Sequence, residues 1–134
     1  MNHDLQQFLT RDPADDFRHQ FWYLAAPYSH PDPAVVKERI QITSKVAARI
    51  TTGYDGDITV FAPTVYTSKL AEAGAHPADG WYTWTLRFLT FCDRLAVLKL
   101  EGWEDSTGIQ LEIATANALK KPVELYTPEY FLES

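Results

Sequence analysis

Cysteine is almost missing from this sequence of 134 residues, since Cys92 is the only one. A single cysteine excludes a disulfide bond within the chain. Long apolar runs are missing as well, and none is long enough for the core of a signal peptide or for a membrane span. We therefore expect a cytoplasmic protein that has no membrane partner.

Histidine is sparse, and the metal-binding spacings HExxH and CxxC do not occur. The four histidines lie far apart, at His3, His19, His30 and His76. We therefore expect neither a metal site nor a cofactor.

Positive charge is in deficit, with 12 Lys and Arg against 18 Asp and Glu and a formal net charge of −6. The basic residues are scattered and form no stripe, which argues against polymeric nucleic acid as a partner. An anionic small molecule remains compatible with this charge, because the N–H groups of a helix N-terminus can hold a phosphate without basic side chains.

What the sequence does contain is apolar residues, which make up 46% of the chain and suffice for one hydrophobic core. Residues 1–20 are polar and include the run RDPADD at 11–16, which lacks the apolar periodicity of a core element. We expect a polar N-terminal arm over 1–20 and a single domain over 21–134.

Four short apolar segments are predicted to be strands. They cover residues 21–25, 58–62, 95–100 and 122–126. Helical spacing of apolar residues predicts helices between them. These cover 33–51, the segment WYTWTLRFLTFCDR from Trp81 onward, and 107–119. Residues 64–80 are ambiguous, with a short helix expected at 68–73.

Strands that alternate with helices of this length predict βαβ units. The expected fold class is therefore α/β, a single-domain Rossmann-like or flavodoxin-like sandwich. A mostly parallel sheet of four to five strands would carry helices on both faces. Ligands of such folds bind at the carboxyl ends of the strands, so we expect the loops after Ala25, Ala62 and Leu100 to surround one crevice.

The third of these loops, residues 105–108, opens a helix that has Glu112 within its first two turns. Ser106 or Thr107 is the expected N-cap. Helical side chains lean toward the N-terminus, so Glu112 should overlook Gly108, where a missing Cβ lets a ligand approach the backbone.

The rest of this helix is apolar nearly all round, which predicts burial on more than one side. A carboxylate in such a helix needs an explanation. One interpretation is that Glu112 is exposed at the helix edge or paired with a lysine, and the other is that it serves a function.

Three segments together resemble the nucleoside 2-deoxyribosyltransferase superfamily. They are YLAAPYS at 23–29, LTFCDRLAVLKL at 89–100 and EDSTGIQLEIATANALKKPV at 104–123. The chain is most similar to a small uncharacterised, DUF1937-like branch from phages and bacteria, related to nucleoside 5′-monophosphate N-glycosidases. The most specific part is the spacing of Asp-Ser, Gly and Glu with its EIA continuation.

The resemblance implies an enzyme in which Glu112 is the nucleophile. The glutamate would attack C1′ of the sugar, displace the base and form a glycosyl-enzyme ester, as in retaining glycoside chemistry. Water or a second base would then resolve the ester.

The resemblance also implies substrate-binding roles in the loops. Ser106 would bind a 5′-phosphate, although a plain N-cap is an equally good interpretation, and both can hold together. Tyr28 would contact the sugar or the nucleophile, or is simply an exposed loop tyrosine. Asp105 would bond a sugar hydroxyl or solvate the loop, and Asp93 looks structural.

Two positions depart from the pattern of the superfamily. Thr85 stands where an aspartate usually relays a proton to the base, and a threonine cannot serve as a general acid at neutral pH. Asp79, another carboxylate or solvent would then supply the proton, or the activity is lost. Tyr66 stands where related small proteins tend to have histidine.

Three aromatic residues, Trp81, Tyr82 and Trp84, follow one another at helical spacing. They either stack on a base or fill the core or a subunit interface. Superfamily members commonly complete their sites with a neighbouring subunit, so the resemblance implies a homo-oligomer, a dimer or larger.

The expected function is hydrolysis of the N-glycosidic bond of a (deoxy)nucleoside 5′-monophosphate, with release of the free base. Its partner would be this small-molecule nucleoside or nucleotide. The alternatives are a nucleoside 2-deoxyribosyltransferase that exchanges bases, a non-catalytic nucleotide-binding or sensor module, and an interaction protein with an aromatic surface.

Overall fold

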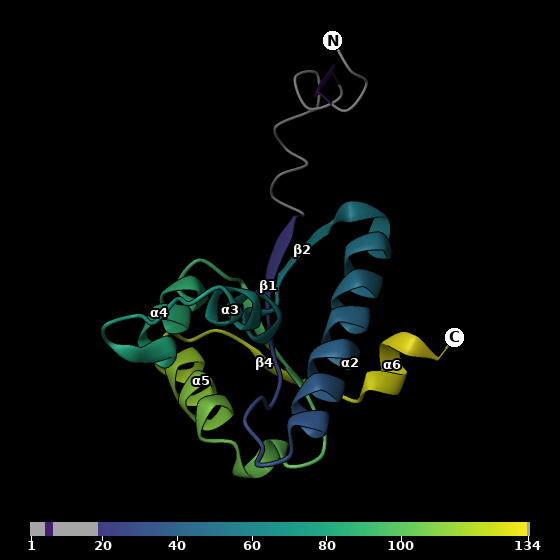
Figure 1. Cartoon of the computed structure of the whole chain (residues 1–134). Coiled ribbons are helices and arrows are strands. Elements are labelled where there is room, and N and C mark those ends of the chain that lie inside the picture. Colours follow the sequence, from purple (N-terminus) through teal and green to yellow (C-terminus); the bar gives the residue numbers. More distant parts are fainter. Residues whose placement is uncertain (1–4, 7–18, 134) are drawn as a thin grey trace.

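Four parallel strands form one sheet in the order β2-β1-β3-β4 (Figure 1). They are β1 (Gln20–Ala25), β2 (Ile58–Phe61), β3 (Arg94–Leu98) and β4 (Val123–Tyr126). The computed structural model describes residues 5–6 and 19–133, so most of the polar arm expected over 1–20 lies outside the described residues. The four predicted strands are confirmed, and each pairing between neighbours is parallel.

Helices connect the strands and follow the last one. They are α2 (Pro33–Thr52), α3 (Pro63–Glu72), α4 (Gly80–Leu89), α5 (Thr107–Ala118) and α6 (Pro128–Leu132), with short 3₁₀ turns η2 (Tyr54–Gly56) and η3 (Trp103–Asp105). The start of α2 is as predicted, since the Asp32 carboxylate accepts a hydrogen bond from the N–H of Ala34 at 2.9 Å and Pro33 occupies the first turn.

Two helix boundaries differ from the prediction. Helix α3 begins at Pro63, earlier than the expected residue 68. Proline is favoured at the first position of a helix, so Pro63 both ends the strand and starts the helix. Helix α4 ends at Leu89 although no helix breaker follows it. The ammonium of Lys121 donates hydrogen bonds to the carbonyls of Thr90 and Cys92, which satisfies groups at this helix end.

The sheet is covered on both faces, as expected for this fold class. Side chains of β1 alternate: Trp22 and Leu24 belong to the hydrophobic cluster under α2 and α6, whereas Tyr23 and Ala25 belong to the cluster under α4 and α5. Figure 1 shows α2 and α6 on one side of the sheet and α4 and α5 on the other.

The strand order defines where a ligand can bind. The chain runs from β1 to its neighbour β2 and then crosses to β3 on the opposite side of β1. The loops that follow β1 and β3 therefore diverge, which leaves a crevice at the carboxyl ends of these strands. None of the helices in the described part of the chain is both long and apolar enough to cross a bilayer.

Candidate active site

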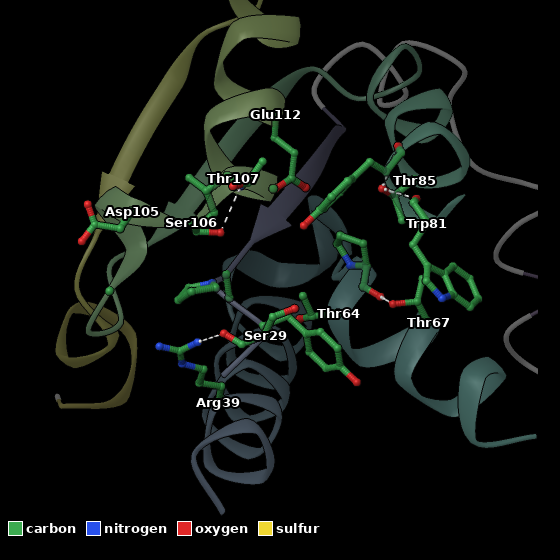
Figure 2. Close-up of a pocket in the computed structure, with 18 residues that line it drawn as sticks. Ser29, Arg39, Thr64, Thr67, Trp81, Thr85, Asp105, Ser106, Thr107 and Glu112 are labelled. Carbon is green, nitrogen blue, oxygen red and sulfur yellow. Dashed lines mark hydrogen bonds between the residues drawn. The ribbon is translucent and has the colours of Figure 1, made fainter. Parts of the chain in front are cut away.

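A cavity of about 360 Å³ lies at the carboxyl ends of β1, β2 and β3 (Figure 2). Its lining comes from residues 26–29 after β1, from the start of α3 after β2, from α4, and from residues 105–109 before and within α5. The three loops that were expected to surround one crevice therefore do so. This volume falls within the range of about 300–1,000 Å³ that is common for small-molecule sites.

Glu112 points from α5 into this cavity (Figure 2). Its side chain lies in the second turn of the helix and is only 8% exposed. Among the described residues, the ion pairs of lysine and arginine involve other carboxylates. The interpretation of Glu112 as an exposed or lysine-paired residue is therefore wrong, and a buried carboxylate without a cation requires a different explanation.

The pKa of Glu112 is unusual for a carboxyl group. Burial raises it from its ordinary value of 4.5 to about 7, and the hydroxyl of Tyr23 opposes this rise. At neutral pH the group is therefore present in both forms. Perturbed carboxyl groups that open into a cavity are typical of catalytic sites.

Tyr23 is the neighbour of Glu112 that the sequence analysis missed. It is fully buried, and its hydroxyl makes no hydrogen bond of good geometry among the described residues, although it lies close enough to Glu112 to lower the pKa of that carboxyl. Burial raises the pKa of Tyr23 far above its ordinary value, and the charge of Glu112 raises it further, so the phenol stays protonated. A small movement of either side chain would let Tyr23 donate a hydrogen bond to Glu112.

Tyr28, the tyrosine singled out in the sequence, lies elsewhere in the site. It lines the cavity from the loop after β1 and is 38% exposed. It is thus available to a ligand, while Tyr23 from the strand itself is the tyrosine that affects the nucleophile candidate.

Ser106 is the N-cap of α5, as one of the two predictions had it. Its Oγ accepts a hydrogen bond from the N–H of Ile109 at 3.3 Å, and it also lines the cavity. The N–H groups of Thr107 and Gly108 belong to the first turn, where no intrahelical acceptor exists. The start of α5 therefore offers backbone N–H donors to the cavity.

Gly108 lines the cavity and also lies under an aromatic side chain. A Cβ at this position would lie 2.7 Å from Cε1 of Tyr82, so the ring of Tyr82 packs close to the glycine. The approach of a ligand to Gly108 stays a prediction.

Arg39 is the second residue that the sequence analysis missed. From α2 its guanidinium donates hydrogen bonds to the carbonyls of Ser29 at 2.9 Å and Glu101 at 2.8 Å. It thereby joins the loop after β1 to the loop after β3, and it lines the cavity. Figure 2 shows the carboxylate of Asp105 at the outer edge of the site, turned away from Glu112.

Thr85 is 7% exposed and lines the cavity from α4. Its hydroxyl donates a shared hydrogen bond to two helix carbonyls, that of Trp81 at 3.0 Å and that of Tyr82 at 3.2 Å. Trp81 and Tyr82 also line the cavity, but Trp84 packs against Phe88 with ring centroids 5.1 Å apart. Trp84 is half-buried, so the aromatic run divides between the cavity and the outer part of α4.

The remaining carboxylates of the sequence analysis lie outside the cavity lining. Asp79 precedes α4 and is exposed. Asp93 accepts a hydrogen bond from the N–H of Phe21 at 2.6 Å, which confirms its structural role. In the part of the chain that the structure describes, no three His, Cys, Asp or Glu side chains gather as metal ligands would.

Comparison with known proteins identifies a family over most of the chain. A family model described as a domain of unknown function, DUF1937, matches residues 20–128. This range runs from β1 through β4 and includes every element that lines the cavity. No curated protein matches the chain. The chain therefore belongs to the DUF1937 family.

Proposed function

We propose that the protein hydrolyses the N-glycosidic bond of a (deoxy)nucleoside 5′-monophosphate and that Glu112 is the nucleophile. The observation that carries the proposal is the buried carboxylate of Glu112, which opens into a cavity of about 360 Å³ without a cationic partner. The resemblance to the nucleoside 2-deoxyribosyltransferase superfamily supplies the reaction class.

The chemistry requires Glu112 as a carboxylate. One of its oxygens attacks C1′ through an oxocarbenium-like transition state, the bond to the base breaks, and a glycosyl ester forms. Water then attacks the ester and regenerates the carboxylate. The protonated hydroxyl of Tyr23 would orient the carboxylate and favour its charged form.

The substrate would bind across Glu112 with its phosphate toward the start of α5. Ser106, the free N–H groups of the first turn and the guanidinium of Arg39 are the groups there that suit an anion. The base would then lie toward α3 and α4, and Tyr28 would contact the sugar. Asp105 would reach the sugar only after its carboxylate turns toward the cavity.

A second candidate function is a nucleotide-binding or sensor module without turnover. Its supporting observation is Thr85, which replaces the expected acid and has its hydroxyl engaged with helix carbonyls.

The transferase alternative differs from hydrolysis only in the molecule that accepts the sugar from Glu112, a second base in place of water. Addition of a second free base to the reaction distinguishes the two.

The test is release of free base from a panel of nucleosides and 5′-monophosphates, measured by chromatography for the wild type and Glu112→Gln. The matched control is Glu38→Gln, which changes an exposed carboxylate on α2 outside the cavity. We expect release by the wild type and the control, and a loss on the order of a thousandfold or more in Glu112→Gln. Binding without release from any substrate would favour the sensor module.

The proposed assembly is a homodimer. It is supported by Leu111 on α5 and by Leu119, which directly follows this helix, because each is 41% exposed in the single chain. Light scattering should give twice the mass of one chain, and Leu111→Asp should give a monomer. A wild-type monomer at micromolar concentration would contradict the assembly.

A further inference from the structure

One wall of the cavity differs chemically from the rest. It is formed by side chains of α3 and α4, here called the α3–α4 wall: Thr64, Thr67, Trp81, Tyr82 and Thr85. Figure 2 shows its labelled members on one side of Glu112, and Asp105 and Ser106 on the other. The labelled members of the α3–α4 wall therefore face the part of a substrate that lies opposite the polar start of α5, while the ring of Tyr82 reaches across to Gly108.

No carboxyl group lies on the α3–α4 wall among the described residues, and the phenol of Tyr82 is its only ionisable side chain. Of all the residues that line the cavity, only Arg39, Asp105 and Glu112 carry a formal charge. Asp105 lies on the opposite side of Glu112, and Asp79 is not part of the lining. The hydroxyl proton of Thr85 is donated to helix carbonyls, and a threonine cannot protonate a leaving group at neutral pH.

This lack of a carboxylic acid favours some leaving bases over others. A neutral purine or pyrimidine that is cut from C1′ departs as an anion unless a donor protonates it, so a well-placed acid accelerates its departure. A base that is a cation while attached to the sugar takes up the electron pair of the broken bond and departs neutral. Such a base needs no proton donor.

We propose that the substrate of this site carries a cationic heterocycle, such as an N-glycosylated pyridinium or an N7-alkylated purine, as its leaving base. The proposal rests on the proposed function, whose leaving group it identifies. Glu112 and the aromatic members of the α3–α4 wall are the groups that recognise the positive ring.

The electrostatics of the cavity favour a cation at this wall. Trp81 and Tyr82 belong to this wall, and an aromatic face that is turned to a cation attracts it by about 0.5–2 kcal/mol. The carboxylate of Glu112 opens into the same cavity. The net charge of −6 on the whole chain adds a negative potential, which also attracts a cation.

The bonds and charges of the reaction balance without an acid. A carboxylate oxygen of Glu112 forms a bond to C1′, the C1′–N bond breaks, and its electron pair neutralises the ring nitrogen. The products of this step are a neutral base and a neutral glycosyl ester. Water then adds to C1′, the electron pair of the ester C–O bond returns to Glu112, and one proton passes to solvent.

The experiment compares matched substrates that differ mainly in the charge of the ring. The first pair is nicotinamide mononucleotide and its dihydro form, and the second is 7-methylguanosine 5′-monophosphate and guanosine 5′-monophosphate. Base release is followed by chromatography, and proton release is followed with a pH indicator in weak buffer. Each rate is divided by the spontaneous rate of the same substrate, because cationic bases also leave faster in water.

We expect kcat/KM, corrected in this way, to be at least about a hundredfold higher for the charged member of each pair. One proton should appear for each charged base released. Equal corrected rates within each pair, or release from neutral bases alone, would overturn the inference and leave the proposed function standing. No release from any substrate would overturn both.

A second experiment adds an acid to the α3–α4 wall and asks whether neutral bases then leave faster. Thr85→Asp introduces a carboxyl group into the α3–α4 wall and should raise base release from guanosine 5′-monophosphate at least about tenfold, with no gain for the 7-methyl substrate. Thr85→Val is the control and should leave the preference for charged bases intact. An equal gain of Thr85→Asp on both substrates would contradict the role assigned to this wall.

Discussion

The hydroxyl of Tyr23 on β1 and the carboxylate of Glu112 on α5 lie close enough to interact. Both groups are almost completely buried, and each alters the pKa of the other. Burial raises the pKa of Glu112 to about 7, while Tyr23 lowers it. A nucleophile of this kind is ionised at mildly alkaline pH and protonated at acid pH.

Tyr23→Phe should shift the pH dependence of the reaction. The rising limb of kcat/KM should lie near pH 7 in the wild type, because only the carboxylate of Glu112 attacks. Removal of the hydroxyl should move this limb to higher pH, because Tyr23 lowers the pKa of Glu112. Measured profiles check this, and Tyr28→Phe should leave the position of the limb unchanged. Identical limbs in the wild type and Tyr23→Phe would refute the coupling.

Glu112→Gln should make the protein more stable at alkaline pH. The folded protein binds a proton at Glu112 up to a pKa of about 7, whereas the unfolded chain releases it near 4.5. Stability therefore falls as the pH rises from 4.5 to 7, by roughly 3 kcal/mol at most. The variant cannot ionise at this site and should avoid this loss.

Denaturant unfolding of both proteins at pH 4.5 and pH 8 tests this prediction. The free energy of unfolding should differ little at the lower pH and favour Glu112→Gln at the higher pH. A wild type that gains stability relative to Glu112→Gln between these two pH values would show that Glu112 is not destabilised by burial.

Gly108→Ala should disturb the cavity more than the fold. The added methyl group would meet the ring of Tyr82 at 2.7 Å and must displace it. Tyr82 is 47% exposed, so its ring can move outward, and alanine gains up to about 1 kcal/mol over glycine in a helix. We expect a change in unfolding free energy within about 1 kcal/mol and a loss of base release of at least about tenfold.

The double variant Gly108→Ala/Tyr82→Ala separates the two effects, because no ring remains to be displaced. Its thermal unfolding should match that of Tyr82→Ala or exceed it. An additive loss of stability would show that Gly108 matters for a reason unrelated to Tyr82.

Arg39→Met should reduce the preference for 5′-monophosphates. The guanidinium is held by the carbonyls of Ser29 and Glu101 beside the cavity, where it suits the phosphate of a substrate. We expect KM to rise about tenfold for a monophosphate and to change little for the matching nucleoside. Arg49→Met, on the exposed side of the same helix, is the control. A parallel loss with both substrates would assign Arg39 to loop positioning alone.

The fold could be predicted because its signals are local. Asp32 and Pro33 mark a helix start within two residues, and the alternation of apolar strands with amphipathic helices fixes the α/β class. Short α6 was not predicted, although Thr127 and Pro128 provide a similar start signal. Its five residues are too few to show periodicity.

The candidate site could be predicted only in part, because its members meet through tertiary packing. Glu112 and Ser106 share one segment, so their relation is readable from spacing. Tyr23 reads as an ordinary strand residue until α5 is packed over its face of the sheet. Arg39 reads as one of many helix-surface arginines until the two loops that it joins are in place.

The most direct test of the central claim is the intact mass of the protein during turnover. Wild type and Glu112→Gln are mixed with the best substrate, quenched in acid within the first turnovers, and analysed by mass spectrometry. The account predicts a wild-type adduct with the mass of the glycosyl phosphate, located on the peptide that contains Glu112 and missing in Glu112→Gln. Base release at the wild-type rate by Glu112→Gln, or an adduct on a different residue, would contradict it.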